Sequence, residues 1–312
     1  MSTIGFDTSN YTTSTAWTDG KTDINVRQIL YVKDGERGIR QSDGVFQHMK
    51  LMPVMYEKLS EQIDFKDVNA VGVSTRPRCV EGSYMPVFLA GEGYAKVVAN
   101  TLGVPLYEFS HQDGHIMAGI YSSGSFELLE NDFISVHLSG GTTEILKSRY
   151  NEFNFDNEII GGSKDISAGQ FIDRVGVKMG LHFPAGKALE QLALKAEKGE
   201  KLPIAVDGAY MNFSGVETKA SRMAESEKCD KSALALGVLE NVRDTLVKTI
   251  NKAMTDTNTH RVLIVGGVAS NGIIRNGLTK KLDGDVYFAK AEYSTDNAVG
   301  IAYLAHLAHK EA

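Results

Sequence analysis

Two segments far apart in the chain repeat one pattern, and this repeat restricts the fold more than any other feature of the sequence. Residues 4–17 run from an apolar strand through Asp-Thr-Ser into a Thr-rich strand, and residues 134–146 run through Ser-Gly-Gly into Thr-Thr-Glu-Ile-Leu. Both segments are typical of β-hairpins, and their recurrence predicts a duplicated fold in which each hairpin opens one half. We therefore expect an α/β protein of two lobes with a cleft between them.

The apolar pattern elsewhere supports the α/β interpretation. Helical spacing occurs at residues 45–62, 87–102, 232–255 and 296–309, and runs typical of buried strands occur at 70–74, 106–109 and 262–265. A chain of 312 residues is long for one core and comfortable for two lobes. The Ser-Ser-Gly-Ser stretch at 122–125 predicts a hinge, so we expect lobes at 1–122 and 123–312, with the last helix packing back across their interface.

Two histidines and a distant carboxylate form the first candidate site. His111 and His115 lie four residues apart, which places both imidazoles on one face of a helix, and Asp296 lies in a Ser-Thr-Asp-Asn-Ala turn. Such a set suits a transition metal with coordination positions left open for chemistry. The alternative is that both histidines face solvent or accept a hydrogen bond in the core. Gln112 argues against a His-Glu-x-x-His protease, because it cannot act as the general base.

Glycine or small hydroxyl residues interrupt four apolar runs, at residues 3–9, 136–143, 213–215 and 262–271. Glycine lets backbone N–H groups approach a phosphate closely, and the helix expected after Gly267 would add its N-terminal dipole. Together the loops predict a nucleotide between the two halves. Each loop alone is also compatible with an ordinary tight turn.

Charge and composition limit the kinds of molecule that the chain is expected to bind and where it is expected to act. A net charge of −6 and a pI near 5.8 give no general nucleic-acid footprint, so any tRNA contact has to be local or supplied by a partner. The sequence shows no signal peptide and no apolar run near membrane-spanning length. Its two cysteines form no disulfide framework. We expect a cytoplasmic protein that does not bind membranes.

The chain resembles the actin-like ATPase superfamily and, within it, the family of the tRNA threonylcarbamoyladenosine transferase catalytic subunit, formerly called O-sialoglycoprotein endopeptidase. Seven motifs carry this resemblance in the family's order along nearly the whole chain. They lie at residues 5–9, 111–115, 139–141, 171–174 with 184–186, 213–215, 266–271 and 294–298.

The resemblance implies an actin-like fold that transfers a threonylcarbamoyl group from an adenylate to tRNA adenosine. It implies one divalent transition metal, iron or zinc, on His111, His115 and Asp296. Some members have a metal-binding Tyr where this chain has His137, which we expect to be a further ligand or to line the cleft near the metal. A smaller non-catalytic paralogue and an ATPase are the implied protein partners. The candidate ligands of the adenine nucleotide or adenylate are Leu138, Ser139, Gly140, Gly141, Thr142, Asp173, Gly186, Gly266, Gly267 and Asn271.

The sequence departs from the family pattern at several positions. Tyr11 and Thr12 stand where an Asp-Glu pair is usual, Thr142 replaces a His, and Glu217 replaces a Lys. A Gly-Pro-Gly-rich stretch has become residues 75–86, with Arg-Pro-Arg-Cys. These changes predict a divergent paralogue and leave three functions open: transfer to tRNA adenosine, carbamoyl-type transfer to another amine, or a nucleotide-binding regulatory subunit without turnover.

Overall fold

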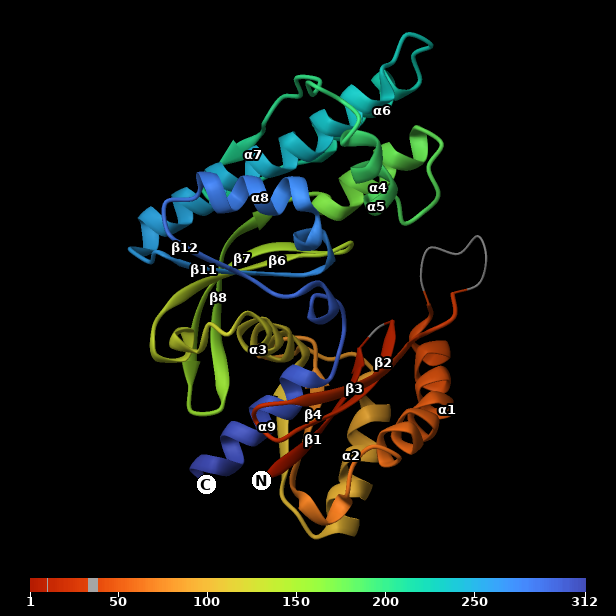
Figure 1. Cartoon of the computed structure of the whole chain (residues 1–312), viewed down its shortest axis with the longest axis vertical. Coiled ribbons are helices and arrows are strands. Elements are labelled where there is room, and N and C mark those ends of the chain that lie inside the picture. Colours follow the sequence, from red (N-terminus) through yellow and green to blue (C-terminus); the bar gives the residue numbers. More distant parts are fainter. Residues whose placement is uncertain (10, 33–38) are drawn as a thin grey trace. The chain divides into compact units, whose positions relative to one another are not determined.

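The computed structural model describes residues 1–9, 11–32 and 39–312, and the chain divides into two compact units (Figure 1). Unit 1 comprises Met1–Glu127, Tyr150–Asp156 and Thr295–Ala312, and unit 2 comprises Leu128–Arg149 and Asn157–Ser294. The lobe boundary expected at residue 122 stays a prediction. The Ser-Ser-Gly-Ser stretch ends a helix, because Gly124 has a φ of 73° and forms the left-handed C-cap.

Unit 1 is built on a five-stranded sheet of order β3-β2-β1-β4-β5. Its strands are β1 (Ser2–Ser9), β2 (Thr12–Thr18), β3 (Asp23–Ile29), β4 (Val68–Arg76) and β5 (Leu106–Ser110). The first three strands are antiparallel, whereas β4 runs parallel to β1 and to β5. The loop after β4 and the helix after β5 therefore leave from the same edge of the sheet.

Four helices of the described residues cover this sheet. Helices α1 (Gln41–Ser60) and α2 (Phe88–Leu102) bury Met52, Leu59 and Ala95 against Ile4 and Phe6 of β1. Helix α9 (Val299–Glu311) packs on β1 and β4 and against α3 (His111–Ser123), as Figure 1 shows. The close contact between α9 and β1 explains why residue 5 is a glycine, since a Cβ on Gly5 would lie 2.5 Å from backbone atoms of Ala298 and Ala302. Gly5 therefore allows the close packing of α9 on β1, and the phosphate role of the loop at residues 3–9 stays a prediction.

Unit 2 is built on a seven-stranded sheet of order β12-β11-β6-β7-β8-β10-β9. Its strands are β6 (Phe133–Leu138), β7 (Thr143–Asn151), β8 (Asn154–Ser163), β9 (Val206–Asp207), β10 (Tyr210–Met211), β11 (Arg261–Val265) and β12 (Asp285–Phe288). Its helices are α4 (Ala168–Lys178), α5 (Gly186–Ala193), α6 (Ser214–Ala224), α7 (Lys231–Thr257) and α8 (Gly272–Lys281). Short 3₁₀ turns across the chain are η1 (Phe65–Asp67), η2 (Phe126–Glu130), η3 (Gly267–Ser270) and η4 (Ala291–Tyr293).

The α/β fold and both hairpins expected from the repeat are confirmed. In β1 and β2 Asp7 pairs with Ser14, and in β6 and β7 Val136 pairs with Ile145. Two α-helices begin a few residues later than the sequence pattern predicted. Helix α9 begins at Val299 because the Asn297 side chain accepts a hydrogen bond from its N–H, which leaves Asp296 in the preceding turn. After Gly267 the chain forms η3 first, and α8 begins at Gly272. No helix in the described residues is long and apolar enough to cross a bilayer.

Candidate metal centre and glycine loops

The start of helix α3 fixes the position of its first residue, His111. Ser110 is the N-cap: its Oγ accepts a hydrogen bond from the Asp113 N–H at 3.1 Å, and Asp113 Oδ2 accepts one from the Ser110 N–H at 3.0 Å. This reciprocal pair is a capping box. Burial raises the pKa of Asp113. Both partners are fully buried, so the first turn of α3 is held on both sides of His111.

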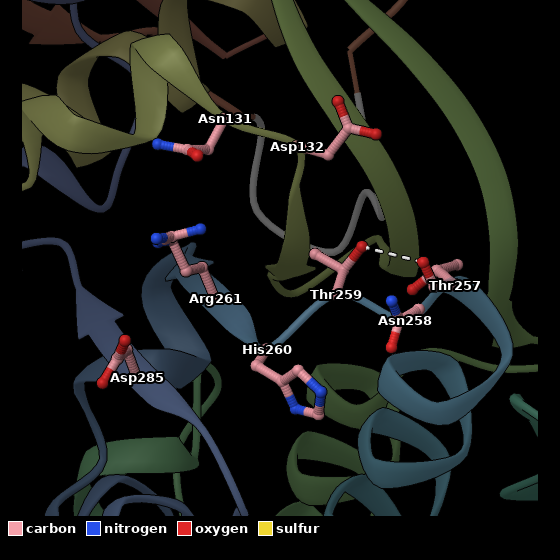
Figure 2. Close-up of a pocket in the computed structure, with 8 residues that line it drawn as sticks. All are labelled: Asn131, Asp132, Thr257, Asn258, Thr259, His260, Arg261 and Asp285. Carbon is pink, nitrogen blue, oxygen red and sulfur yellow. Dashed lines mark hydrogen bonds between the residues drawn. The ribbon is translucent and has the colours of Figure 1, made fainter.

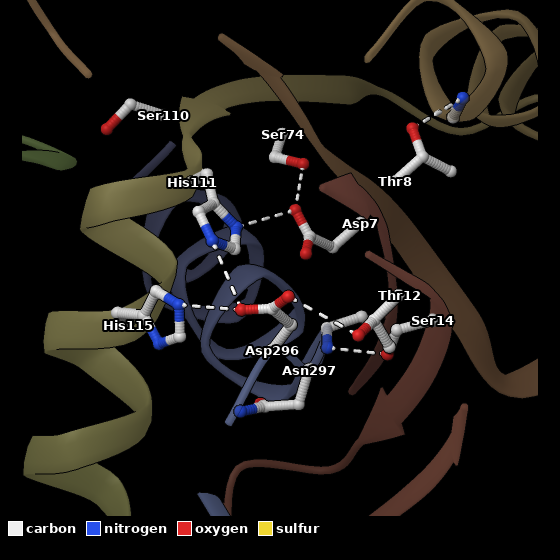
Figure 3. Close-up of polar contacts among 12 residues, drawn as sticks. Asp7, Thr8, Thr12, Ser14, Ser74, Ser110, His111, His115, Asp296 and Asn297 are labelled. Atoms are coloured by element: carbon white, nitrogen blue, oxygen red, sulfur yellow. Dashed lines mark hydrogen bonds and ion pairs between the residues drawn. The ribbon is translucent and has the colours of Figure 1, made fainter. Parts of the chain in front are cut away.

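His111, His115 and Asp296 meet within unit 1, as Figure 3 shows. One ligand atom of each lies within 4.8 Å of the others. Asp296 Oδ1 is 3.6 Å from His111 Nε2 and 3.3 Å from His115 Nε2. The two ring centroids are 4.4 Å apart with an interplanar angle of 77°. The helical spacing therefore places both imidazoles on one face, and the turn before α9 brings the carboxylate to them.

Strong electrostatic coupling links these three groups. Burial acts to lower the pKa of His111, but the carboxylates of Asp7 and Asp296 outweigh burial and raise this pKa to about 10. Burial acts to raise the pKa of Asp296, yet hydrogen bonds to His111 and His115 hold it well below its usual value. Two imidazole nitrogens and one carboxylate oxygen that converge in this way fit the donor set of a divalent transition metal.

Two residues that the sequence did not assign to this site extend it. Asp7 contacts His111, and Ser74 contacts Asp7. Asp7 Oδ1 lies 3.1 Å from His111 Nδ1, and the Ser74 hydroxyl donates a short hydrogen bond to the same oxygen. The sequence contained a signal: Asp7 interrupts an apolar strand, and a buried carboxylate needs a hydrogen-bonding or charged partner.

The turn that carries Asp296 is held by strands β2 and β3. Arg27 Nη1 donates to Thr295 Oγ1 at 2.7 Å and to the Asp296 carbonyl at 3.1 Å. Ser14 Oγ accepts from the Ala298 N–H at 2.8 Å. These contacts join residues more than 260 positions apart, and no local sequence pattern predicts them. They fix the backbone on both sides of the Asp296 side chain.

Two of the predicted glycine loops lie side by side in unit 2. One follows β6 and one follows β11, and these parallel strands pair His137 with Val265 at their carboxyl ends. A Cβ built on Gly266 would lie 2.2 Å from the Leu138 carbonyl oxygen, so the two backbones touch. A Cβ on Gly140, Gly141 or Gly267 would meet nothing within 4 Å. The loops are thus packed at their base and open at their tips.

Hydrogen bonds define the shape of the first loop. The Ser139 N–H donates to the Thr142 carbonyl at 2.9 Å, and the Thr142 N–H donates to Ser139 Oγ at 3.0 Å. Ser167 at the start of α4 donates to the Gly140 carbonyl at 2.8 Å. The carbonyl groups are therefore used inside the protein. Backbone N–H groups of glycines at such a loop tip suit an anion.

The remaining candidate nucleotide residues lie in the same unit and have structural partners. Asp173 Oδ1 on α4 accepts from the Ala185 N–H at 2.7 Å, directly before Gly186 starts α5. Burial raises the pKa of Asp173. Asn271 is the N-cap of α8, where Oδ1 accepts from the Ile274 N–H at 3.1 Å. Their nucleotide contacts stay predictions.

His137 lies on β6 of unit 2, and its metal role stays a prediction.

A separate pocket of about 440 Å³ opens near the amino ends of β11 and β12 (Figure 2). It lies at the end of these strands opposite to the glycine loops, so it is not part of the nucleotide site predicted from the sequence. Its lining is polar and of mixed charge: Asn131, Asp132, Thr257, Asn258, Thr259, His260, Arg261 and Asp285.

Comparison with known proteins decides the family. Residues 37–303 match the family model described as tRNA N6-adenosine threonylcarbamoyltransferase. A protein of that name from Thermus thermophilus is 30% identical over 322 residues, which cover 99% of this chain and 94% of the relative. The chain belongs to the tRNA N6-adenosine threonylcarbamoyltransferase family. This membership confirms the resemblance and identifies the chain with a transferase family rather than with proteases.

Solved structures confirm the fold predicted for this family member. Full-length HypF, in a phosphate- and nucleotide-bound form, superposes with a TM-score of 0.62 at 16% identity, covering 99% of this chain and 55% of HypF. The activator of 2-hydroxyisocaproyl-CoA dehydratase from Clostridium difficile, with bound ADPNP, gives 0.55 at 15% identity and covers 100% and 96% of the two chains. At these identities the likeness establishes the two-sheet actin-like ATPase fold alone.

Proposed function

We propose that this chain transfers a threonylcarbamoyl group from threonylcarbamoyl-adenylate to the amine of a tRNA adenosine. The observation that carries the proposal is the convergence of His111, His115 and Asp296 within 4.8 Å, in a chain of the threonylcarbamoyltransferase family. A divalent transition metal, iron or zinc, held by these three residues would supply Lewis acidity to the donor.

The chain's own groups have two tasks in this reaction. The backbone N–H groups of Gly140, Gly141 and Gly267, where an added Cβ would meet no atom within 4 Å, would bind the adenylate phosphate and stabilise negative charge that develops on it. Asp173, Gly186 and Asn271 would hold the nucleoside. The amine nitrogen then bonds to the carbamoyl carbon, the bond from that carbon to the phosphate oxygen breaks, AMP leaves with the electron pair, and the amine loses a proton.

We make three further proposals that are consistent with this activity, on location, protein partners and tRNA contact. The cytoplasm, where tRNA is modified, is the expected location. A smaller non-catalytic paralogue and an ATPase are the expected protein partners. Because the net charge is −6, we propose that one of them supplies basic surface for tRNA.

The test is a transfer assay with synthetic threonylcarbamoyl-adenylate and unmodified tRNA, read by mass spectrometry of digested nucleosides and by AMP release. Wild type is compared with His115→Ala and with His182→Ala, whose histidine is exposed in unit 2. Cell extract lacking its own transferase supplies partners in a parallel arm. Modified tRNA from wild type and His182→Ala, and none from His115→Ala, is expected.

The other outcomes separate the alternatives. AMP release with a small amine, but no modified tRNA even with extract, would replace tRNA by another acceptor. Nucleotide binding without AMP release in any arm would make the chain a regulatory subunit and overturn the proposal.

A further inference from the structure

Asp7 is a charged residue in the interior of unit 1. Its side chain is fully buried in β1, and so is Ser74 in the neighbouring strand β4. Burying a carboxylate destabilises a protein unless charge and hydrogen bonds compensate. A position that keeps such a group in the middle of a sheet therefore requires an explanation from its contacts.

The contacts of Asp7 converge on one histidine. Oδ1 lies 3.1 Å from His111 Nδ1 and also accepts the short hydrogen bond from the Ser74 hydroxyl (Figure 3). Oδ2 is buried and has no hydrogen-bond partner in the described residues. The carboxylate is thus oriented through a single oxygen, and the partners that orient it are Ser74 and His111.

This arrangement determines which nitrogen of His111 faces the cluster. With Nδ1 directed at Asp7, the other nitrogen, Nε2, faces Asp296 Oδ1 at 3.6 Å. His115 presents Nε2 to the same oxygen at 3.3 Å. A histidine that binds a metal through one nitrogen is commonly oriented by a carboxylate at the other. Asp7 occupies that place for His111.

We propose that Asp7 is a positioning residue for His111 and that Ser74 holds Asp7 in place. When Nε2 holds a metal, Asp7 accepts the remaining ring proton, which is on Nδ1, and so keeps Nε2 directed at the ion. The inference rests on the metal site of the proposed function and is independent of the acceptor. Asp7 itself contacts neither metal nor substrate.

The experiment measures Zn²⁺ affinity of the metal-free full chain by competition with a chromophoric chelator, at one pH. Asp7→Ala is expected to weaken Zn²⁺ binding about 10- to 100-fold, the usual effect of removing such a partner. Asp7→Asn keeps an oxygen that accepts from Nδ1–H, so its loss is expected to be smaller. Ser74→Ala is expected to weaken binding in the same direction and by less than Asp7→Ala.

Thr15→Val is the matched control, because Thr15 is also buried and its hydroxyl donates to the Gly5 carbonyl at 3.1 Å, away from the cluster. It is expected to lower the melting temperature without changing Zn²⁺ affinity. Affinities are compared only among variants with native circular dichroism, and Asp7→Asn keeps the test available if Asp7→Ala does not fold.

Two results would overturn the inference. Wild-type affinity in folded Asp7→Asn and Ser74→Ala would show that Asp7 does not position His111, while the metal site itself stands. Absence of Zn²⁺ binding in wild type would reject the metal site and this inference with it. Substitution of Co²⁺ adds a readout independent of activity, since a displaced His111 changes the visible absorption band of the bound ion.

Discussion

The hydroxyl of Thr12 donates a hydrogen bond to Asp296, with Oγ1 3.3 Å from Oδ2. The other carboxylate oxygen, Oδ1, faces the two imidazole nitrogens. The two oxygens of Asp296 therefore have different partners. The sequence showed Thr12 at a position where the family usually has a carboxylate. In the structure Thr12 is a neutral hydrogen-bond donor that orients the carboxylate of Asp296.

We predict that Thr12→Val weakens metal binding about 10-fold, because valine keeps the volume but cannot donate to Asp296. Chelator competition with Zn²⁺ measures this change. Thr13→Val is the control, since the Thr13 hydroxyl contacts His48 Nδ1 at 2.7 Å instead of the cluster. Equal losses in both variants would attribute the effect to general loosening of β2.

Removing any one of the three proposed ligands is expected to empty the site. Elemental analysis of purified protein should give about one metal per wild-type chain and near-background metal for His111→Ala, His115→Ala and Asp296→Ala. Two ligands cannot hold a metal as tightly as three. His182→Ala, at an exposed position of unit 2, should keep the wild-type content. Retained metal in all three folded ligand variants would reject the site.

The local sequence predicted the parts of the fold and site that depend only on the residue spacing of one helix or one hairpin. The spacing of His111 and His115 needed only the geometry of one helix, and the two hairpins needed only alternation and turn residues. The contacts of Asp7 with Ser74 and of Thr12 with Asp296 join distant strands and turns. Their formation depends on sheet order and register, which a single sequence does not encode locally. The turn at Asp296 was predicted, but the helical spacing from residue 296 placed the start of the last helix three residues before its observed start at Val299.

Substitutions at the two neighbouring glycines after β11, Gly266 and Gly267, are expected to have different effects, one on folding and the other on nucleotide binding. Gly267→Val should fold, because a Cβ there meets no atom within 4 Å, and should weaken ATP binding at least 10-fold in calorimetry by occupying the space a phosphate needs. Gly266→Val should instead unfold the protein, because Gly266 has a φ of 103° and its Cβ would lie 2.2 Å from Leu138. Unchanged ATP affinity in Gly267→Val would remove this loop from the nucleotide site.

Asp165 connects the stability of unit 2 to pH. Burial acts to raise its pKa, but hydrogen bonds from Ser214, Phe213 and Ile166 lower it to about 2. A carboxyl group whose folded pKa is depressed stabilises the protein above its unfolded pKa of about 4 and loses this effect as the pH falls towards 2.

We therefore predict that Asp165→Asn lowers the free energy of unfolding by about 1 kcal/mol at pH 6, because solvent screens the charge at this exposed position. The difference from wild type should shrink between pH 4 and pH 3 in urea titrations. Asp283→Asn, at an exposed carboxylate, should show neither effect. A difference that stays constant down to pH 3 would assign the loss to packing instead of charge.

Glu217 tests whether tRNA approaches helix α6. Its Oε1 accepts a hydrogen bond from Ser221 at 2.7 Å in the first turn of the helix, so its negative charge is held near the loop of residues 213–215. If tRNA phosphates come close, Glu217→Lys should strengthen tRNA binding several-fold at low salt and steepen its salt dependence by about one to two phosphate contacts. Glu227→Lys makes the same charge change at an exposed position beyond α6 and controls for net charge. Filter binding at four salt concentrations measures both variants, and equal gains would show that tRNA responds to total charge and does not contact α6.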